Sequence, residues 1–121
     1  GLGLKSTVLQ RKMMDLDARV AGRDNWISAA DAVHLYQIIR ALHPEDRAWL
    51  EPMLLAQQDT SLLLRDVPRD SLDFYHKTGS LPAVLHDWGY TRERELFLLT
   101  SGVDDESAVN TVFAELGKVL I

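Results

Sequence analysis

Residues 77 to 80 read Lys-Thr-Gly-Ser and follow the aromatic run Phe74-Tyr75-His76. A lysine, a hydroxyl group, a residue without a Cβ and a further backbone N–H group could form one wall of an active site. The same residues could simply end a strand, because lysine and threonine are common on strand edges and Gly-Ser is a common turn. Taken alone, the stretch favours the strand end, so its surroundings must decide.

The other titratable residues give no clear site. The four histidines, His34, His43, His76 and His86, form no ligand pair such as H-E-x-x-H, and cysteine is absent, so we expect no metal and no cofactor. By strand alternation His76 lies on the opposite side from Lys77, and we expect it to be a packing or surface residue. Asp87 is expected to pair with Arg92 or Arg94, or to accept N–H groups of a hairpin.

The composition is that of one soluble domain. The chain has 121 residues, of which 46% are hydrophobic and 26% charged, and its net charge is −5. This acidic balance disfavours nucleic acid as a partner. No apolar run approaches the ~20 residues of a transmembrane helix, and "GLGLKSTVLQRKMMD" does not have the pattern of a signal peptide.

The first half predicts a loop followed by helices. Residues 1–27 have little periodicity and indicate mainly an irregular, structured loop, although "MMDLDARVAGRDNW" could hold a helical turn. Ser28 is a good N-cap, with Asp31 in the first turn. An apolar face then follows at helical spacing: Ala32, Leu35, Tyr36, Ile39 and Leu42.

A second helix is predicted from Pro44, which suits a first helical position. Its expected buried stripe is Trp49, Leu50, Met53 and Leu54. Pro52 should kink this helix or split it into two. The stretch "DTSLLLRDVP" indicates a short helical turn and then a loop.

From about Ser71 the pattern changes to strands. The segments "LDFYHKTG", "AVLHDWGY" and "ELFLLTS", separated by the turn-type clusters "SLP" and "TRER", predict three consecutive antiparallel strands. Asp104 or Asp105 should cap a last helix, whose apolar face is Val109, Val112, Phe113, Leu116 and Leu120. The fold class is therefore α+β: a three-stranded antiparallel sheet packed with helices. Because "ELFLLTS" resembles a central strand, the sheet looks incomplete.

These segments resemble, in order, the C-terminal half of class A β-lactamases and related β-lactamase-like serine hydrolases, the penicillin-recognising family. "HKTGSLPAVLHDWGY" is similar to the family's K-T-G strand, hairpin and following strand, "ELFLLTSG" to its last strand, and "DDESAVNTVFAELGKVL" to its C-terminal helix. Upstream, "TVLQRKMMDLDARVAGRDNWISAADAVHLYQII" is similar to the omega loop and the helix after it. The resemblance implies an incomplete β-lactamase/transpeptidase-like fold: a single partial domain with an omega-loop-like segment (1–27), a helical segment (28–69) and the K-T-G strand, two further strands and the C-terminal helix (70–121).

The resemblance gives the K-T-G stretch a role. It implies that Lys77 is catalytic and substrate-binding, supplying charge for a substrate carboxylate and for proton transfer. Thr78 would donate a hydrogen bond to that carboxylate, Gly79 would leave room for the acyl group, and the Ser80 N–H would be an oxyanion donor.

The chain also departs from the family pattern. It contains no S-x-x-K and no S-D-N, so it has no recognisable nucleophile. Met13 stands where the family has the glutamate that activates the deacylating water, and methionine cannot accept a proton. Asp15 and Asp17 are nearby carboxylates that could substitute, although we favour their interpretation as loop charges or as the cap of a turn.

Two functions follow as expectations. The first is the C-terminal portion of a serine hydrolase that acts on a β-lactam or another acyl donor, with its nucleophile on an absent N-terminal half. The alternative is an inert binding or structural module with the same fold. The expected partners are a small acyl substrate and either the missing half or a second copy by strand exchange. The resemblance also implies an extracytoplasmic location, secreted or periplasmic.

Overall fold

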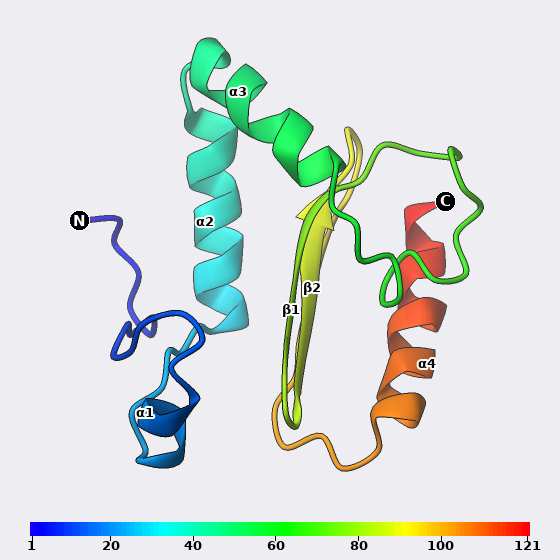
Figure 1. Cartoon of the computed structure of the whole chain (residues 1–121). Helices are drawn as coiled ribbons and strands as arrows, with labels where there is room; N and C mark the ends of the chain where they lie inside the picture. The colour runs from blue at the N-terminus through cyan, green and yellow to red at the C-terminus, as the bar shows by residue number, and fades with distance from the viewer.

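The computed structural model describes residues 1–121 and confirms the α+β class (Figure 1). In chain order the helices are α1 (Leu16–Val20), α2 (Ala29–Ala41) and α3 (Pro44–Leu55). The strands β1 (Tyr75–Leu81), β2 (Val84–Tyr90) and β3 (Glu95–Leu99) follow, and then α4 (Glu106–Gly117) and a short 3₁₀-helix, η1 (Lys118–Leu120). None of the helices combines the length and the apolar character needed to cross a membrane.

The predicted helix caps are confirmed. Ser28 accepts a hydrogen bond from the N–H of Asp31 at 3.1 Å and so begins α2. Asp105, one of the two predicted caps, accepts from the N–H of Ala108 at 3.0 Å and begins α4. Pro44 occupies the first turn of α3, where its missing N–H removes no hydrogen bond.

The three strands form one antiparallel sheet in the order β1-β2-β3. Gly79 lies opposite His86, and Thr78 lies opposite Asp87. This alternation places Thr78 and Asp87 on one face of the sheet and Gly79 and His86 on the other. A Cβ at Gly89 would lie 2.2 Å from the Tyr75 carbonyl oxygen, so only glycine allows β1 and β2 to approach here.

One face of the sheet packs against α4, as Figure 1 shows. The core on this side consists of six buried residues: Leu62, Leu63, Phe74, Leu85, Phe113 and Leu120. Gly117 lets α4 come very close, since a Cβ there would lie 1.7 Å from the Leu63 carbonyl oxygen. Two residues of the predicted apolar face, Val112 and Leu116, are instead exposed.

Aromatic side chains connect the other face of the sheet to α2 and α3. Tyr36 of α2 lies 5.1 Å from Tyr90 and 5.9 Å from Phe97 between ring centroids. The Tyr90 hydroxyl also donates to Glu51 of α3 at 3.2 Å. These contacts fix α2 and α3 against the end of the sheet.

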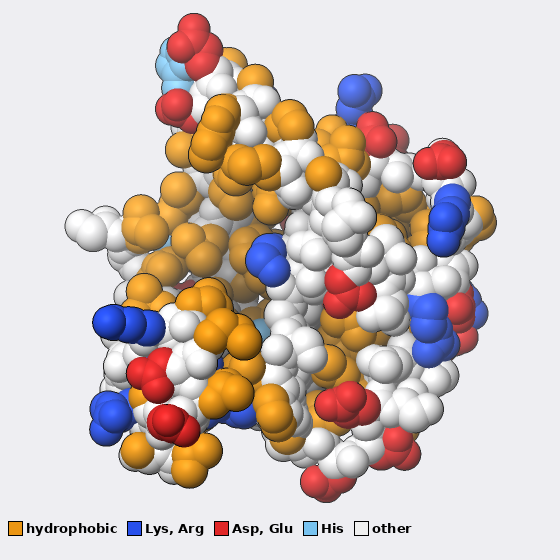
Figure 2. All heavy atoms as spheres, in the orientation of Figure 1, with side chains coloured by type: hydrophobic (Ala, Val, Ile, Leu, Met, Phe, Trp, Pro, Cys, Tyr) orange, Lys and Arg blue, Asp and Glu red, His pale blue; other side chains and the backbone are white.

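The prediction of a buried stripe on α3 is wrong. The helix has no buried residue; Trp49 is 72% exposed, and Met53 is also exposed. The spacing of the stripe correctly indicates an apolar face, on which Leu50 and Leu54 are half-buried, but no other part of the chain covers Trp49 and Met53. Figure 2 shows hydrophobic side chains gathered over α3 and around a hollow beside it.

The helix also continues through Pro52 to Leu55 and is not split into two. Proline removes one N–H donor, and in the last turn of a helix that loss affects a single hydrogen bond. Residues 1–27, predicted to be an irregular loop, contain the one-turn helix α1.

Candidate functional site

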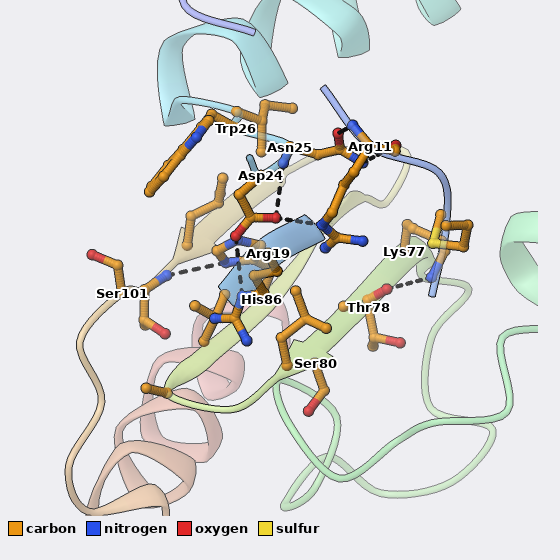
Figure 3. Close-up of a pocket in the computed structure, with 18 of the residues that line it drawn as sticks. Arg11, Arg19, Asp24, Asn25, Trp26, Lys77, Thr78, Ser80, His86 and Ser101 are labelled. Atoms are coloured by element: carbon orange, nitrogen blue, oxygen red, sulfur yellow. Dashed lines mark hydrogen bonds and ion pairs between the residues drawn. The ribbon is translucent and has the colours of Figure 1, made fainter. Parts of the chain in front are cut away.

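A cavity of about 980 Å³ lies between the segment 11–29 and the sheet (Figure 3). Lys77, Thr78, Gly79 and Ser80 of β1 line it, together with His86, Leu99 and Thr100. The facing wall includes Arg11, Met13, Met14, Arg19, Asp24 and Trp26. The structure therefore brings the K-T-G stretch and the omega-loop-like segment to one concave site, of a volume usual for small-molecule sites.

The four K-T-G residues present different groups. The Lys77 ammonium donates to the carbonyl oxygen of Thr78, the next residue along the strand. Thr78 is nearly buried, whereas Ser80 is exposed. A Cβ at Gly79 would lie 3.9 Å from the His86 Cβ, an ordinary contact distance, so the glycine leaves space in the cavity and is not required by close packing.

His86 is a cavity residue that sequence reasoning missed. Burial lowers its pKa below the ordinary value, so the ring is neutral at pH 7. Its Nδ1 lies 3.1 Å from the N–H of Thr100 and 2.8 Å from the carbonyl oxygen of Leu85. The first contact needs a bare Nδ1 and the second a protonated one, so a neutral ring satisfies one of them at a time. The hairpin register would have revealed His86, since it lies directly across from Gly79.

His76 and Asp87 form a buried pair behind the K-T-G stretch. His76 Nδ1 lies 2.7 Å from Asp87 Oδ1, and both side chains are almost completely buried. The second oxygen of Asp87 accepts from the N–H of Leu63 at 3.1 Å. The expected pairing of Asp87 with Arg92 or Arg94 is therefore wrong: strand alternation turns Asp87 inward, to the face that carries His76. His76 is the packing residue that the sequence predicts, and its ring stacks on Phe74.

Asp59 is an acidic residue of the cavity that the sequence did not indicate. Its Oδ1 accepts from the Ser61 hydroxyl at 2.6 Å and from the Ser61 N–H at 2.9 Å. These bonds lower the pKa of Asp59, and the charge of the nearby Lys77 contributes further. Asp59 is thus a carboxylate beside the K-T-G lysine.

The facing wall presents two methionines, and a thioether offers no proton acceptor. Met13 is 84% exposed and lines the cavity, as does Met14, which has a positive φ of 65°. Asp15 caps α1 by accepting from the N–H of Ala18 at 3.0 Å, and Asp17 lies in the first turn of the same helix. Neither carboxylate lines the cavity.

An ion-pair cluster holds the facing wall together. Asp24 accepts from Arg11 Nε at 2.7 Å and from Arg19 Nε at 3.0 Å, as Figure 3 shows. The Arg11 hydrogen bond, with further contributions from Asn25 and Arg19, holds the pKa of Asp24 below its usual range. No three histidine, aspartate or glutamate side chains lie close enough together to hold a metal ion.

The fold matches that of known proteins. A family model described as Beta-lactamase enzyme family matches residues 1–121. The beta-lactamase from Sphaerobacter thermophilus DSM 20745 aligns with a TM-score of 0.75 and 26% sequence identity, over 97% of this chain and 47% of that chain. PBP-A aligns with a TM-score of 0.73 and 19% identity, over 97% of this chain and 45% of that chain. A leucine-to-glutamate mutant of PBP-A, described as an acyl-enzyme complex with penicillin-G, gives the same values.

These similarities define a β-lactamase-type α+β protein, and the chain belongs to the beta-lactamase enzyme family. It spans about half the length of the solved structures that it matches. No curated protein matches it significantly.

Proposed function

We propose that this chain supplies the K-T-G wall of a serine acyl-transfer site for β-lactams or a related acyl donor. The observation that carries the proposal is the common cavity. Its volume is about 980 Å³, and Lys77 to Ser80 line one side of it while the omega-loop-like segment lines the other. In that site Lys77 and Thr78 would bind the substrate carboxylate, and the Ser80 N–H would stabilise the oxyanion. The serine nucleophile would come from an N-terminal half of the same fold.

The exposed surface supports the need for a partner. A compact monomer of this mass exposes about 6,600 Å², whereas the chain exposes 8,040 Å². The excess, about 1,400 Å², exceeds the ~800 Å² that one partner contributes to a standard protein interface. Trp49 and Met53 lie on this surface, and no strand pairs with the outer edges of β1 and β3. The N-terminal half is the proposed cover, and strand exchange with a second copy is the alternative.

The family suggests the location. Since β-lactams and their relatives act on targets outside the cytoplasm, we place the complete protein in an extracytoplasmic compartment, secreted or periplasmic. Fractionation of cells that produce the complete protein tests this placement, and recovery in the cytoplasm alone would contradict it.

Covalent labelling tests the acyl-transfer proposal. The chain is produced together with the proposed N-terminal half, and a fluorescent penicillin is added. We expect a labelled band, and Lys77→Ala should lower the labelling rate about 100-fold. Lys118→Ala is the matched control, because Lys118 pairs with Glu115 at the other end of the chain and should leave labelling unchanged. Equal labelling of the two variants would contradict the role of Lys77.

One observation favours a second function. Met13 places a thioether, not a carboxylate, on the cavity wall, and Asp15 is engaged as a helix cap. A protein with this wall could bind an acyl donor, or a ligand of similar shape, without turnover. Reversible binding of penicillin with no covalent label, in the presence of the N-terminal half, would favour this inert module.

A further inference from the structure

The wall formed by residues 1–27 is anchored to α2. Asp31 accepts hydrogen bonds from the N–H groups of Lys5 and Ser6, at 3.0 and 2.8 Å, and from the Thr7 hydroxyl at 2.8 Å. Val8 and Trp26 form an isolated antiparallel β-bridge within the segment. These contacts hold the wall together and fix it to α2, which packs on the sheet through Tyr36, but none of them reaches the turn between β1 and β2.

A single side chain makes the hydrogen bond that joins this wall to the sheet. Arg19 Nη2 donates to the carbonyl oxygen of Pro82 at 2.9 Å, in the turn between β1 and β2. No other hydrogen bond or ion pair of the structure connects residues 1–27 with residues 75–99. Arg19 also lines the cavity, and Figure 3 shows its side chain directed at Asp24.

The bridge uses the geometry of the guanidinium group. Nε of Arg19 donates to Asp24 Oδ2 at 3.0 Å while Nη2 reaches Pro82, so one planar group bonds to both walls. Asp24 is a firm anchor because Arg11 holds its other oxygen at 2.7 Å. A lysine at position 19 has a single nitrogen in place of this planar fork, so we expect it to hold the two partners less firmly.

We infer that Arg19 is a positioning residue that sets the width of the cavity. By joining the Asp24 cluster to the β1–β2 turn, it holds the methionine wall at a fixed distance from Lys77 to Ser80. The inference that the cavity width affects substrate binding rests on the proposed acyl-transfer function. The Arg19 link between Asp24 and Pro82, here called the tether, does not depend on that function.

A distance measurement tests the tether. The chain contains no cysteine, so cysteines introduced at Val20 and Arg92 can be spin-labelled selectively. Both sites are exposed; Val20 ends α1, and Arg92 lies in the β2–β3 turn. Double electron–electron resonance should give a narrow distribution of the distance between the two spin labels in the parent protein. For Arg19→Lys the mean distance should be longer and the distribution broader. Arg23→Lys, at an exposed arginine without a side-chain hydrogen bond, should match the parent. Identical distributions for the Arg19 and Arg23 variants would overturn the inference.

Labelling in the presence of the N-terminal half tests the effect on substrate. Arg19→Lys should raise the penicillin concentration for half-maximal labelling about tenfold or more, with a smaller change in the rate at saturation. A broadened distance with unchanged concentration dependence would show a purely structural tether and contradict a positioning role. If the parent protein is not labelled at all, the proposed function fails, and the distance measurement alone decides the role of Arg19.

Discussion

At the scale of single residues, the two walls of the cavity differ in their chemistry. Lys77 and His86 face the cavity, one as a cation and the other as a neutral ring. Met13 occupies the opposite wall and offers no proton acceptor. Under the proposed acyl-transfer function, we expect such a site to form an acyl adduct faster than water can release it.

Met13→Glu should therefore speed release. A glutamate at this exposed cavity position could deprotonate water, and we expect the lifetime of a penicillin adduct to fall about 100-fold. The measurement is the decay of the label after removal of free fluorescent penicillin. Met14→Glu carries the same charge one residue away and is the matched control. An unchanged lifetime for the Met13 variant would remove Met13 as the reason for slow release.

His86 should titrate below its ordinary value. Its folded pKa is lowered by burial, whereas in the unfolded chain it is about 6.5. The unfolded state thus binds the proton first, so stability is complete above about pH 6.5 and is lost as the pH falls toward the folded pKa. An NMR titration of the His86 ring should give a midpoint below 6.5. A midpoint at or above that value would show that the ring is not buried as the structure has it.

At the scale of elements, the sequence predicted correctly the features that depend only on neighbouring residues, such as helix caps. Ser28 begins α2 and Asp105 begins α4 because each cap needs only its own first turn. The buried stripe on α3 failed because burial depends on what covers a helix, and periodicity shows only its apolar face. The His76–Asp87 pair was missed for a related reason: the sequence places the two residues on strands, but their partnership depends on the register between the strands.

The hydrogen bonds that Asp31 accepts from Lys5, Ser6 and Thr7 should stabilise the N-terminal segment in a pH-dependent way. Hydrogen bonds from Thr7 first, and from the N–H groups of Lys5 and Ser6, lower the pKa of Asp31. A lowered aspartate pKa contributes stability above the unfolded value of about 3.9, and this stability is lost as the pH falls through the folded pKa. Asp31→Asn should lower the Tm at pH 7, and the difference from the parent should shrink below about pH 4.

Thermal melts at several pH values, followed by circular dichroism, measure this difference. Asp46→Asn is the control, because Asp46 is exposed in the first turn of α3 and accepts no side-chain hydrogen bond from another residue. A loss of Tm in the Asp31 variant that persists at pH 3 would point to a packing defect and contradict the electrostatic account.

At the scale of the whole molecule, the chain is a sheet with one face covered by α4, the other partly covered by α2 and α3, and a large exposed surface. The α4 face holds the hydrophobic core, whereas Trp49 and Met53 on α3 are exposed. The sequence predicted an incomplete sheet from its central-type strand, and the structure shows where the uncovered surface lies.

Binding of the N-terminal half should therefore change the association state and the thermal stability of the chain. We expect sedimentation of the isolated chain to show self-association or a dye-binding, loosely packed monomer. Addition of the N-terminal half should give a one-to-one complex with a higher Tm. A stable monomer that binds no hydrophobic dye and ignores the N-terminal half would contradict this expectation.

The central claim is that Lys77 to Ser80 bind the acyl donor, and amide NMR of the complete protein with a penicillin tests it most directly. Our account predicts that the largest shifts on ligand addition occur at the N–H groups of Thr78, Gly79 and Ser80, with smaller shifts around Met13 across the cavity. Shifts that cluster elsewhere, or none at a saturating concentration, would contradict the assignment of this strand as the substrate wall.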